Sequence, residues 1–187
     1  VNGLWMLVAQ AKESAEWFTG EEIPDSRIAK IHHTLRLQME NIILIGMPGC
    51  GKTAVGQQLA QKLGKKFVDA DESLEARVCR KITDIIPNDG EAAFREMESE
   101  TLAELGKQSG LVIATGGGCV TQPQNYPLLH QNGTIFWLKR ELDKLPTDGR
   151  PLSQKGTLGQ MYEARMPLYL RFADAAISND GSIAETA

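Results

Sequence analysis

One stretch of the sequence has the residue types and spacing needed to bind the phosphates of a nucleoside triphosphate. The pattern Gly-x-x-x-x-Gly-Lys-Thr is complete, with its fixed positions at Gly46, Gly51, Lys52 and Thr53. The glycines allow backbone torsions that turn amide N–H groups toward an anion, and the lysine neutralises the β- and γ-phosphates. The threonine hydroxyl is a ligand for Mg²⁺. The residues predicted to bind the nucleotide are Gly46, Gly49, Cys50, Gly51, Lys52, Thr53 and Ala54.

The phosphate loop alone does not identify what is phosphorylated, because switch GTPases, motors and ATPases share it. The sequence lacks the base-reading Asn-Lys-x-Asp pattern of GTPases. Asp69-Ala70-Asp71 follows a short apolar run, and ligands bind at the carboxyl edge of the sheet in open α/β folds. These carboxylates can serve a metal shell and a hydroxyl acceptor. The equal alternative is that they begin a helix, with Asp71 capping a helix that starts at Glu72.

Further along the chain, charged residues and glycines recur at positions suited to an acceptor site. Arg95 and Glu98 are three residues apart and share a helix face, although a surface salt bridge explains that spacing equally well. The run Gly116-Gly117-Gly118 ends an apolar stretch, which indicates either close approach of a ligand to the backbone or a flexible loop. Arg150 follows Asp148-Gly149 in a loop, and Arg165 lies in the last long helical pattern.

The elements that must position these residues alternate regularly from residue 41 onward. Short apolar runs predict strands, and runs with a period of 3.6 residues predict helices. Such alternation indicates an α/β fold with a parallel sheet covered on both faces. The predicted strands are 41–46, 66–69, 111–115, 134–139 and 175–178, and the predicted helices are 52–63, 72–79, 91–107, 123–131 and 158–172, with a turn at 88–90 and Pro123 in the first turn of its helix.

The first 40 residues do not belong to this alternation. Residues 3–18 form one amphipathic pattern that ends at Gly20, and residues 26–40 can form a second helix. The acidic, proline-containing segment 21–25 between them is typical of a linker. We therefore expect two parts, a helical appendage with its linker at 1–40 and an α/β domain at 41–187.

The bulk composition narrows the classes of partner. The formal net charge is −4, which argues against a general nucleic-acid binder, and no apolar run reaches the roughly 20 residues that span a bilayer. The three cysteines, Cys50, Cys79 and Cys119, are far apart and form no metal-binding pair, which is typical of thiols in a reducing compartment. We expect a cytoplasmic protein without nucleic-acid or membrane partners.

Taken together and in order, the motifs resemble those of shikimate kinase. The order is the phosphate loop, Asp-x-Asp, Phe94-Arg-x-x-Glu98, Gly-Gly-Gly, Arg150-Pro-Leu and Arg165-x-Pro-x-Tyr169, and it covers nearly everything from residue 41 to about 178. The resemblance implies a five-stranded parallel sheet flanked by helices, a P-loop kinase of the nucleoside-monophosphate-kinase type. It implies transfer of the γ-phosphoryl group of ATP to the 3-hydroxyl of shikimate, assisted by Mg²⁺, in aromatic amino acid biosynthesis.

The resemblance also implies roles for single residues. Asp71 contacts the substrate hydroxyls and helps to activate the attacking one, and Asp69 lies near Mg²⁺ beside Thr53. Arg150 meets the phosphates from a closing lid, so that Lys52, Asp71 and Arg150 form the catalytic set. The residues implied to bind shikimate are Asp71, Arg95, Gly116, Gly117, Gly118 and Arg165, with Glu98 holding Arg95.

The chain departs from the family pattern between Leu138 and Arg150, where the segment is shorter than in many members. Those members carry an arginine before the lid that stacks on adenine. Arg140 and Lys144 are the two basic candidates here.

The first segment has a resemblance of its own. Residues 2–11, Asn-Gly-Leu-Trp-Met-Leu-Val-Ala-Gln-Ala, and 17–20, Trp-Phe-Thr-Gly, resemble the carboxyl-terminal helix of shikimate dehydrogenase, in which a glutamine matching Gln10 contacts the substrate. This resemblance implies a dehydrogenase–kinase fusion or its remnant, without dehydrogenase activity because a nicotinamide-binding domain is missing. An ordinary amphipathic appendage is the alternative. The apolar side of the helix also suggests self-association.

Two other functions remain open at this stage. A related P-loop kinase acting on gluconate or a nucleotide would share the phosphate loop, but it would not need two arginines that converge on a carboxylate. A catalytically silent nucleotide-binding module would not need Lys52, Thr53, Asp71 and Arg150 together.

Overall fold

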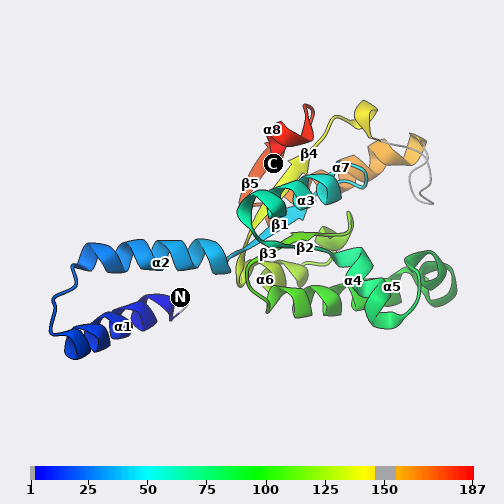
Figure 1. The fold of residues 1–187 in the computed structure, drawn as a ribbon. Coiled ribbons are helices and arrows are strands. Elements are labelled where there is room, and N and C mark those ends of the chain that lie inside the picture. Colours follow the sequence, from blue (N-terminus) through cyan, green and yellow to red (C-terminus); the bar gives the residue numbers. More distant parts are fainter. Residues whose placement is uncertain (1–2, 146–154) are drawn as a thin grey trace. The chain divides into compact units, whose positions relative to one another are not determined.

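The computed structural model describes residues 3–145 and 155–187, and contacts between residues divide the chain into two compact units, 1–40 and 41–187. The larger unit is built on a five-stranded sheet with the order β2-β3-β1-β4-β5 (Figure 1). All four strand pairs are parallel, as the alternation of strands and helices predicted. The strands are β1 (Asn41–Ile45), β2 (Lys66–Asp69), β3 (Leu111–Ala114), β4 (Gly133–Lys139) and β5 (Ala175–Ser178).

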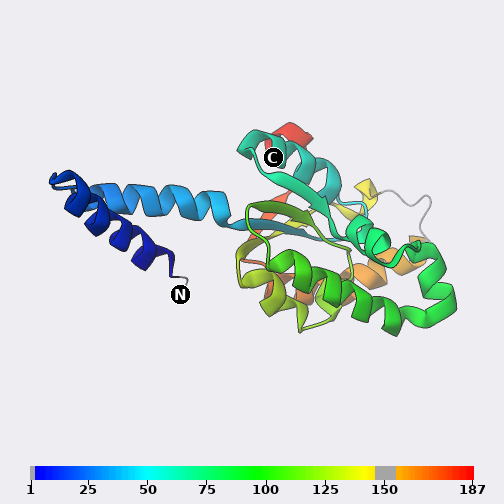
Figure 2. The same cartoon turned by 60° about the horizontal axis from the view of Figure 1, so that its bottom comes forward.

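Helices cover both faces of this sheet. Helix α3 (Lys52–Leu63) packs on β1, β2 and β3 and against the short α8 (Ile183–Thr186). Helices α5 (Ile82–Gly106), α6 (Asn125–His130) and α7 (Lys155–Phe172) lie on the opposite face (Figure 2). Helix α4 (Ala70–Val78) packs between β2 and α5, and two short 3-10 helices, η1 (Cys119–Thr121) and η2 (Leu142–Lys144), complete the connections.

The core lies between the sheet and its two helical layers. The central strands β1 and β3 are almost wholly apolar, with Ile43 and Ile113 fully buried, because each central strand is covered on both faces. Trp137 of β4 stacks on Tyr169 of α7 with ring centroids 5.6 Å apart. The core thereby fixes the carboxyl ends of the strands, from which the site residues extend.

Two local expectations need correction. The segment 82–89 is helical, although only 91–107 was predicted, and α5 breaks at Gly90, whose φ of 87° is open to glycine. Pro87 concealed this helix, because proline removes a backbone donor and usually marks a helix end. Helix α6 begins at Asn125, so Pro123 precedes the helix instead of lying in its first turn.

The smaller unit is a helical hairpin. Helices α1 (Leu4–Thr19) and α2 (Asp25–Met39) pack through Leu4, Val8 and Ile28, with Leu35 partly buried against them. Gly20 ends α1 in the left-handed conformation, as the sequence predicted. Lys12 Nζ donates to Asp25 Oδ1 at 2.6 Å and ties the start of α2 to α1.

Candidate active site

The phosphate loop connects β1 to α3 and is held open by its glycines. Gly51 precedes α3 with a φ of 97°, and a Cβ atom at that position would lie 2.5 Å from Asn179 Nδ2. A Cβ at Gly46 would lie 2.5 Å from the carbonyl oxygen of Leu138. Both positions therefore exclude any side chain, which explains why the spacing of glycines identified the loop.

Lys52 begins α3 and folds back over the loop. Its Nζ donates to the carbonyl oxygens of Gly46 at 2.9 Å and Met47 at 3.0 Å, and the side chain is buried. The ammonium group thus lies inside the curve of the loop, where a bound phosphate would meet it.

Asp69 ends β2 and performs two tasks with its two carboxylate oxygens. Oδ1 accepts from the backbone N–H of Asp71 at 3.0 Å and of Glu72 at 3.5 Å, so Asp69 is the N-cap of α4. Oδ2 accepts from the Thr53 hydroxyl at 3.0 Å. The capping alternative for this motif was thus half right: a carboxylate caps the helix, but it is Asp69 rather than Asp71, and the side chain of Asp71 lines the cavity instead.

The environment of Asp71 makes its carboxylate unusually basic. Burial, together with the nearby charges of Glu98 and Asp69, raises the pKa of Asp71 to about 6 against the opposing charges of Lys52 and Arg95. A Cβ at Gly116 would lie 2.8 Å from Asp71 Oδ1 and 2.6 Å from Glu98 Oε1. The glycine therefore leaves room for two carboxylates at the end of β3.

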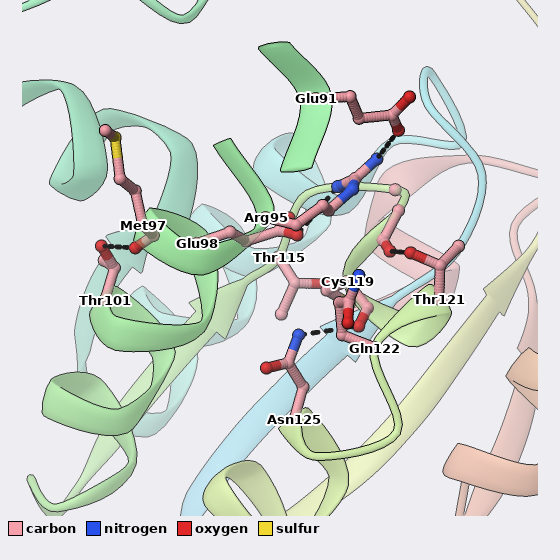
Figure 3. Close-up of polar contacts among 12 residues, drawn as sticks. Glu91, Arg95, Met97, Glu98, Thr101, Thr115, Cys119, Thr121, Gln122 and Asn125 are labelled. Atoms are coloured by element: carbon pink, nitrogen blue, oxygen red, sulfur yellow. Dashed lines mark hydrogen bonds and ion pairs between the residues drawn. The ribbon is translucent and has the colours of Figure 1, made fainter. Parts of the chain in front are cut away.

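Arg95 and Glu98 form a buried ion pair on α5. Arg95 donates from Nη1 to Glu98 Oε2 at 2.8 Å and from Nη2 to Glu91 at 3.1 Å, as Figure 3 shows. The Glu98 side chain is 3% exposed, so the surface salt bridge considered for this spacing is excluded. A Cβ at Gly118 would lie 2.3 Å from Arg95 Nη2, and the bare backbone therefore lets the guanidinium cross the loop after β3.

Arg165 reaches the same loop from α7. Its Nη1 donates to the carbonyl oxygen of Gly117 at 3.3 Å, and the Tyr169 hydroxyl donates to that oxygen at 2.5 Å. Gly117 itself packs against Pro48 of the phosphate loop, where a Cβ would lie 2.6 Å from the proline ring. The triple glycine is thus a packed junction between the two halves of the site, and the flexible-loop alternative is wrong for it.

These residues line one cavity of about 620 Å³, a volume suited to small ligands. The phosphate loop forms one side, and the carboxylates, the two arginines and the triple glycine form the other. The cavity also has an apolar wall that the motifs did not reveal, because apolar residues at helical spacing look like ordinary core; its members are Ile82, Ile86, Pro87, Phe94 and Met161, with Thr83 between them.

Two sequence expectations concern the nucleotide side. Arg150, expected in the catalytic set, lies outside the described residues. Arg140 and Lys144 are the two candidates for the residue that stacks on adenine. Lys144 pairs with Glu141 at 2.9 Å, whereas Arg140 Nη1 lies 3.9 Å from where a Cβ on Gly51 would be. Within residues 3–145 and 155–187 no polar atom meets the buried Nε of Arg140. This geometry favours Arg140 over Lys144 as a group facing the nucleotide side.

The donors available to a metal ion are few. Thr53 and Asp69 offer a hydroxyl and a carboxylate oxygen, the hard oxygen ligands that Mg²⁺ prefers. The described part of the chain holds no group of three or more histidine, cysteine or acidic residues arranged to hold a metal. It likewise contains no helix with the length and apolar character to cross a bilayer.

Comparisons with known proteins point to one family. A family model described as "Shikimate kinase" matches residues 48–187. Shikimate kinase of Burkholderia pseudomallei (strain 1710b) is 39% identical over 150 residues, which cover 73% of this chain and 79% of the relative. Shikimate kinase of Synechococcus sp. (strain CC9605) is 40% identical over 155 residues, which cover 78% of this chain and 77% of the relative.

A solved structure shares the fold as well as the sequence. The shikimate kinase from Acinetobacter baumannii in complex with shikimate superposes with a TM-score of 0.75 at 34% identity. The match covers 81% of this chain and 89% of that chain.

Proposed function

The chain belongs to the shikimate kinase family, and from this premise we propose that it transfers the γ-phosphoryl group of ATP to the 3-hydroxyl of shikimate. The observation that carries the proposal is the single cavity in which a phosphate loop faces two arginines and a basic carboxylate. Shikimate has one carboxylate and three hydroxyls. Guanidinium groups suit the carboxylate, and a carboxylate with backbone groups suits the hydroxyls.

On the nucleotide side, the backbone N–H groups of the loop bind the phosphates and Lys52 neutralises their charge. The bonds from Lys52 Nζ to the carbonyl oxygens of Gly46 and Met47 hold the ammonium at the phosphate loop, which supports its assignment to the β- and γ-phosphates. Charge that develops on the transferring group is stabilised by this fixed cation. Arg150 is assigned to the same task on its motif alone.

Thr53 and Asp69 are the residues that would hold Mg²⁺. Their hydroxyl and carboxylate oxygens are 3.0 Å apart at the mouth of the loop, and both atoms fit a hard cation. Held there, Mg²⁺ would neutralise charge on the nucleotide phosphates.

On the acceptor side, Asp71 orients the attacking hydroxyl and takes up its proton. A pKa of about 6 leaves Asp71 ionised at neutral pH while making it a better proton acceptor than an exposed aspartate. Arg165 and Arg95 bind the carboxylate of shikimate, and Glu98 fixes the guanidinium of Arg95. The main-chain groups of Gly116, Gly117 and Gly118 contact the ring substituents.

The test is a coupled assay of ADP release with ATP, Mg²⁺ and a panel of acceptors: shikimate, gluconate and nucleoside monophosphates. We expect turnover with shikimate alone. Turnover with gluconate or a nucleotide instead would identify the protein as a related P-loop kinase. Nucleotide binding without turnover on any acceptor would indicate a catalytically silent module.

We further propose that residues 1–40 are a helical appendage, separate from the kinase domain at 41–187 and derived from the end of a shikimate dehydrogenase. Trp17 and Phe18 on α1 are more than 90% exposed, and the hairpin buries few apolar side chains of its own. Such a surface suits a partner: a fused or neighbouring dehydrogenase domain, or the same helix of a second chain. Cys50, Cys79 and Cys119 are unpaired thiols, and we place the protein in the reducing cytoplasm.

A further inference from the structure

Asn179 is a buried polar residue that none of the site motifs includes. It follows β5 and is 3% exposed. Its backbone N–H donates to the carbonyl oxygen of Lys139 at 2.7 Å, which continues the pairing of β5 with β4 by one residue. The side chain is thereby directed from the sheet edge toward the phosphate loop.

The side-chain amide of Asn179 is satisfied at both ends. Its Nδ2 donates to the carbonyl oxygen of Cys50 at 2.7 Å, and its Oδ1 accepts from the Thr186 hydroxyl at 2.8 Å. The Cys50 carbonyl fixes which end of the amide is nitrogen, because a flipped amide would set two oxygens against each other there, and the remaining amide oxygen faces the Thr186 hydroxyl. A side chain with one donor and one acceptor is therefore required at this position.

The bond to Cys50 determines the direction of the next amide in the loop. In a trans peptide the C=O and the following N–H point in opposite directions within the peptide plane. Holding the Cys50 carbonyl against Asn179 turns the Gly51 N–H away from Asn179. The positive φ of Gly51, 97°, and the 2.5 Å approach of a hypothetical Cβ to Asn179 Nδ2 show how tightly this peptide is enclosed.

Thr186 is itself held in place by the last turn of the chain. Helix α8 has a capping box between Ser182 and Glu185, in which Glu185 Oε2 accepts from the Ser182 backbone N–H at 2.9 Å and from the Ser182 hydroxyl at 2.8 Å. Lys62 of α3 donates to the carbonyl oxygen of Ala184 at 3.2 Å and anchors the turn beside the helix that carries Lys52. The turn and the amide thus form a continuous series of contacts that ends at the phosphate loop.

We propose that Asn179 is a positioning residue for nucleotide phosphate binding, which sets the peptide plane between Cys50 and Gly51 and is itself oriented by Thr186. The proposal rests on the proposed function, because it assigns the loop to ATP and ADP. It predicts that the carboxyl end of β5 controls nucleotide affinity through hydrogen bonding and leaves acceptor binding unaffected.

The experiment measures ADP and shikimate binding separately by calorimetry. Asn179→Asp keeps the shape but places an oxygen against the Cys50 carbonyl. We expect the dissociation constant for ADP to rise about tenfold, since a buried hydrogen bond is replaced by a repulsion, while the constant for shikimate stays within about twofold. Thr186→Val removes the orienting hydroxyl and should raise the ADP constant about two- to threefold.

Asn132→Asp is the matched control. Its amide also donates to carbonyl and hydroxyl oxygens, Gln108 O at 2.9 Å and Ser109 Oγ at 3.0 Å, in the turn before β4 at the other end of the sheet. This variant should bind ADP as the unaltered protein does. An unchanged ADP constant in Asn179→Asp, or equal losses for ADP and shikimate, would overturn the proposal.

Two further outcomes are decisive. If Asn179→Asp does not fold, the Thr186→Val variant decides: weaker ADP binding with intact shikimate binding supports the proposal, and unchanged ADP binding refutes it. An unaltered protein that binds ADP but does not phosphorylate shikimate would count against the proposed function alone. A lower ADP affinity of Asn179→Asp would still support the role of Asn179 in that case.

Discussion

The two sides of the cavity are built from different materials. The nucleotide side consists mainly of backbone, with glycines at Gly46 and Gly51 where a side chain would collide with Leu138 or Asn179. The acceptor side relies on charged side chains from three helices, among them Asp71, Arg95 and Arg165, beside the backbone of the triple glycine. A backbone site requires few residue types, whereas a side-chain site requires each group to be held by another.

This difference determines what mutations can report. On the nucleotide side, the Lys52 ammonium pairs with neutral carbonyl oxygens, so its removal leaves no unpaired buried charge. On the acceptor side, Arg95 is paired with a buried carboxylate, so its removal changes stability as well as binding. The following experiments test this contrast, from the largest expected effect to the smallest.

Lys52→Ala should have the largest effect on turnover. Loss of a fixed cation at the transferring phosphoryl group should lower kcat by at least about 10²–10³, because an electrostatic contact of this kind acts mainly in the transition state. Steady-state kinetics with saturating shikimate measure it, and Lys107→Ala, on the exposed end of α5, is the control. Near-full turnover by Lys52→Ala would refute the kinase function.

Asp71→Asn should lower kcat about 10²-fold or more, because the group that accepts the hydroxyl proton is lost. The same substitution should stabilise the fold. The folded-state pKa of about 6 exceeds the ordinary value of 3.8, so ionised Asp71 destabilises the folded protein. The gain in thermal stability should be full above pH 6 and should shrink as the pH falls from 6 toward 4. Thermal melts across this range without ligands measure it, and a variant that is less stable at pH 8 would contradict the assignment.

In the unaltered protein, the loss of activity toward acidic pH should reflect protonation of the same group, Asp71. The value of kcat/KM for shikimate should fall as the pH drops through about 6, because protonated Asp71 cannot accept the hydroxyl proton. The pH dependence of kcat/KM for shikimate measures this loss. A profile that stays flat down to pH 5 would remove Asp71 from the role of base.

Arg165→Ala and Arg95→Ala should both raise the KM for shikimate, by about tenfold, and change the KM for ATP little. They should differ in stability. Arg95→Ala leaves Glu98 buried without its partner, at a cost of about 3–5 kcal/mol, whereas Arg165 gives up one longer bond to Gly117. Equal melting temperatures for the two variants would show that the pair on α5 does not hold the acceptor side together.

Removal of residues 1–40 should have the smallest effect on catalysis. All the residues that line the described cavity come from the unit at 41–187, so shikimate-dependent turnover should stay within about twofold. Sedimentation should show less self-association if α1 pairs between chains through Trp17 and Phe18. A truncated chain that fails to fold would show that the appendage belongs to the kinase core.

Much of this arrangement could be predicted from the sequence because it depends on local patterns. The phosphate loop is identifiable from glycine spacing, and the five strands from short apolar runs, since both signals come from a few adjacent residues. The apolar wall at Ile82 and Ile86 could not be identified, because Pro87 interrupts the helical pattern and its partners come from α7. The role of Asn179 could not be predicted either, because its partners, Cys50 and Thr186, come to it only through the folded sheet and the turn after it.

The double task of Asp69 has a consequence for how sequence drift at this position is interpreted. One carboxylate oxygen of Asp69 caps α4, and the other accepts a hydrogen bond from the Thr53 hydroxyl. The start of the helix and the contact with Thr53 therefore depend on the same side chain. A variant that loses activity at position 69 does not by itself identify a metal ligand, because the start of the helix that carries Asp71 is lost as well. A substitution at position 69 therefore changes the helix cap and the chemistry of the site together, and neither can vary without the other.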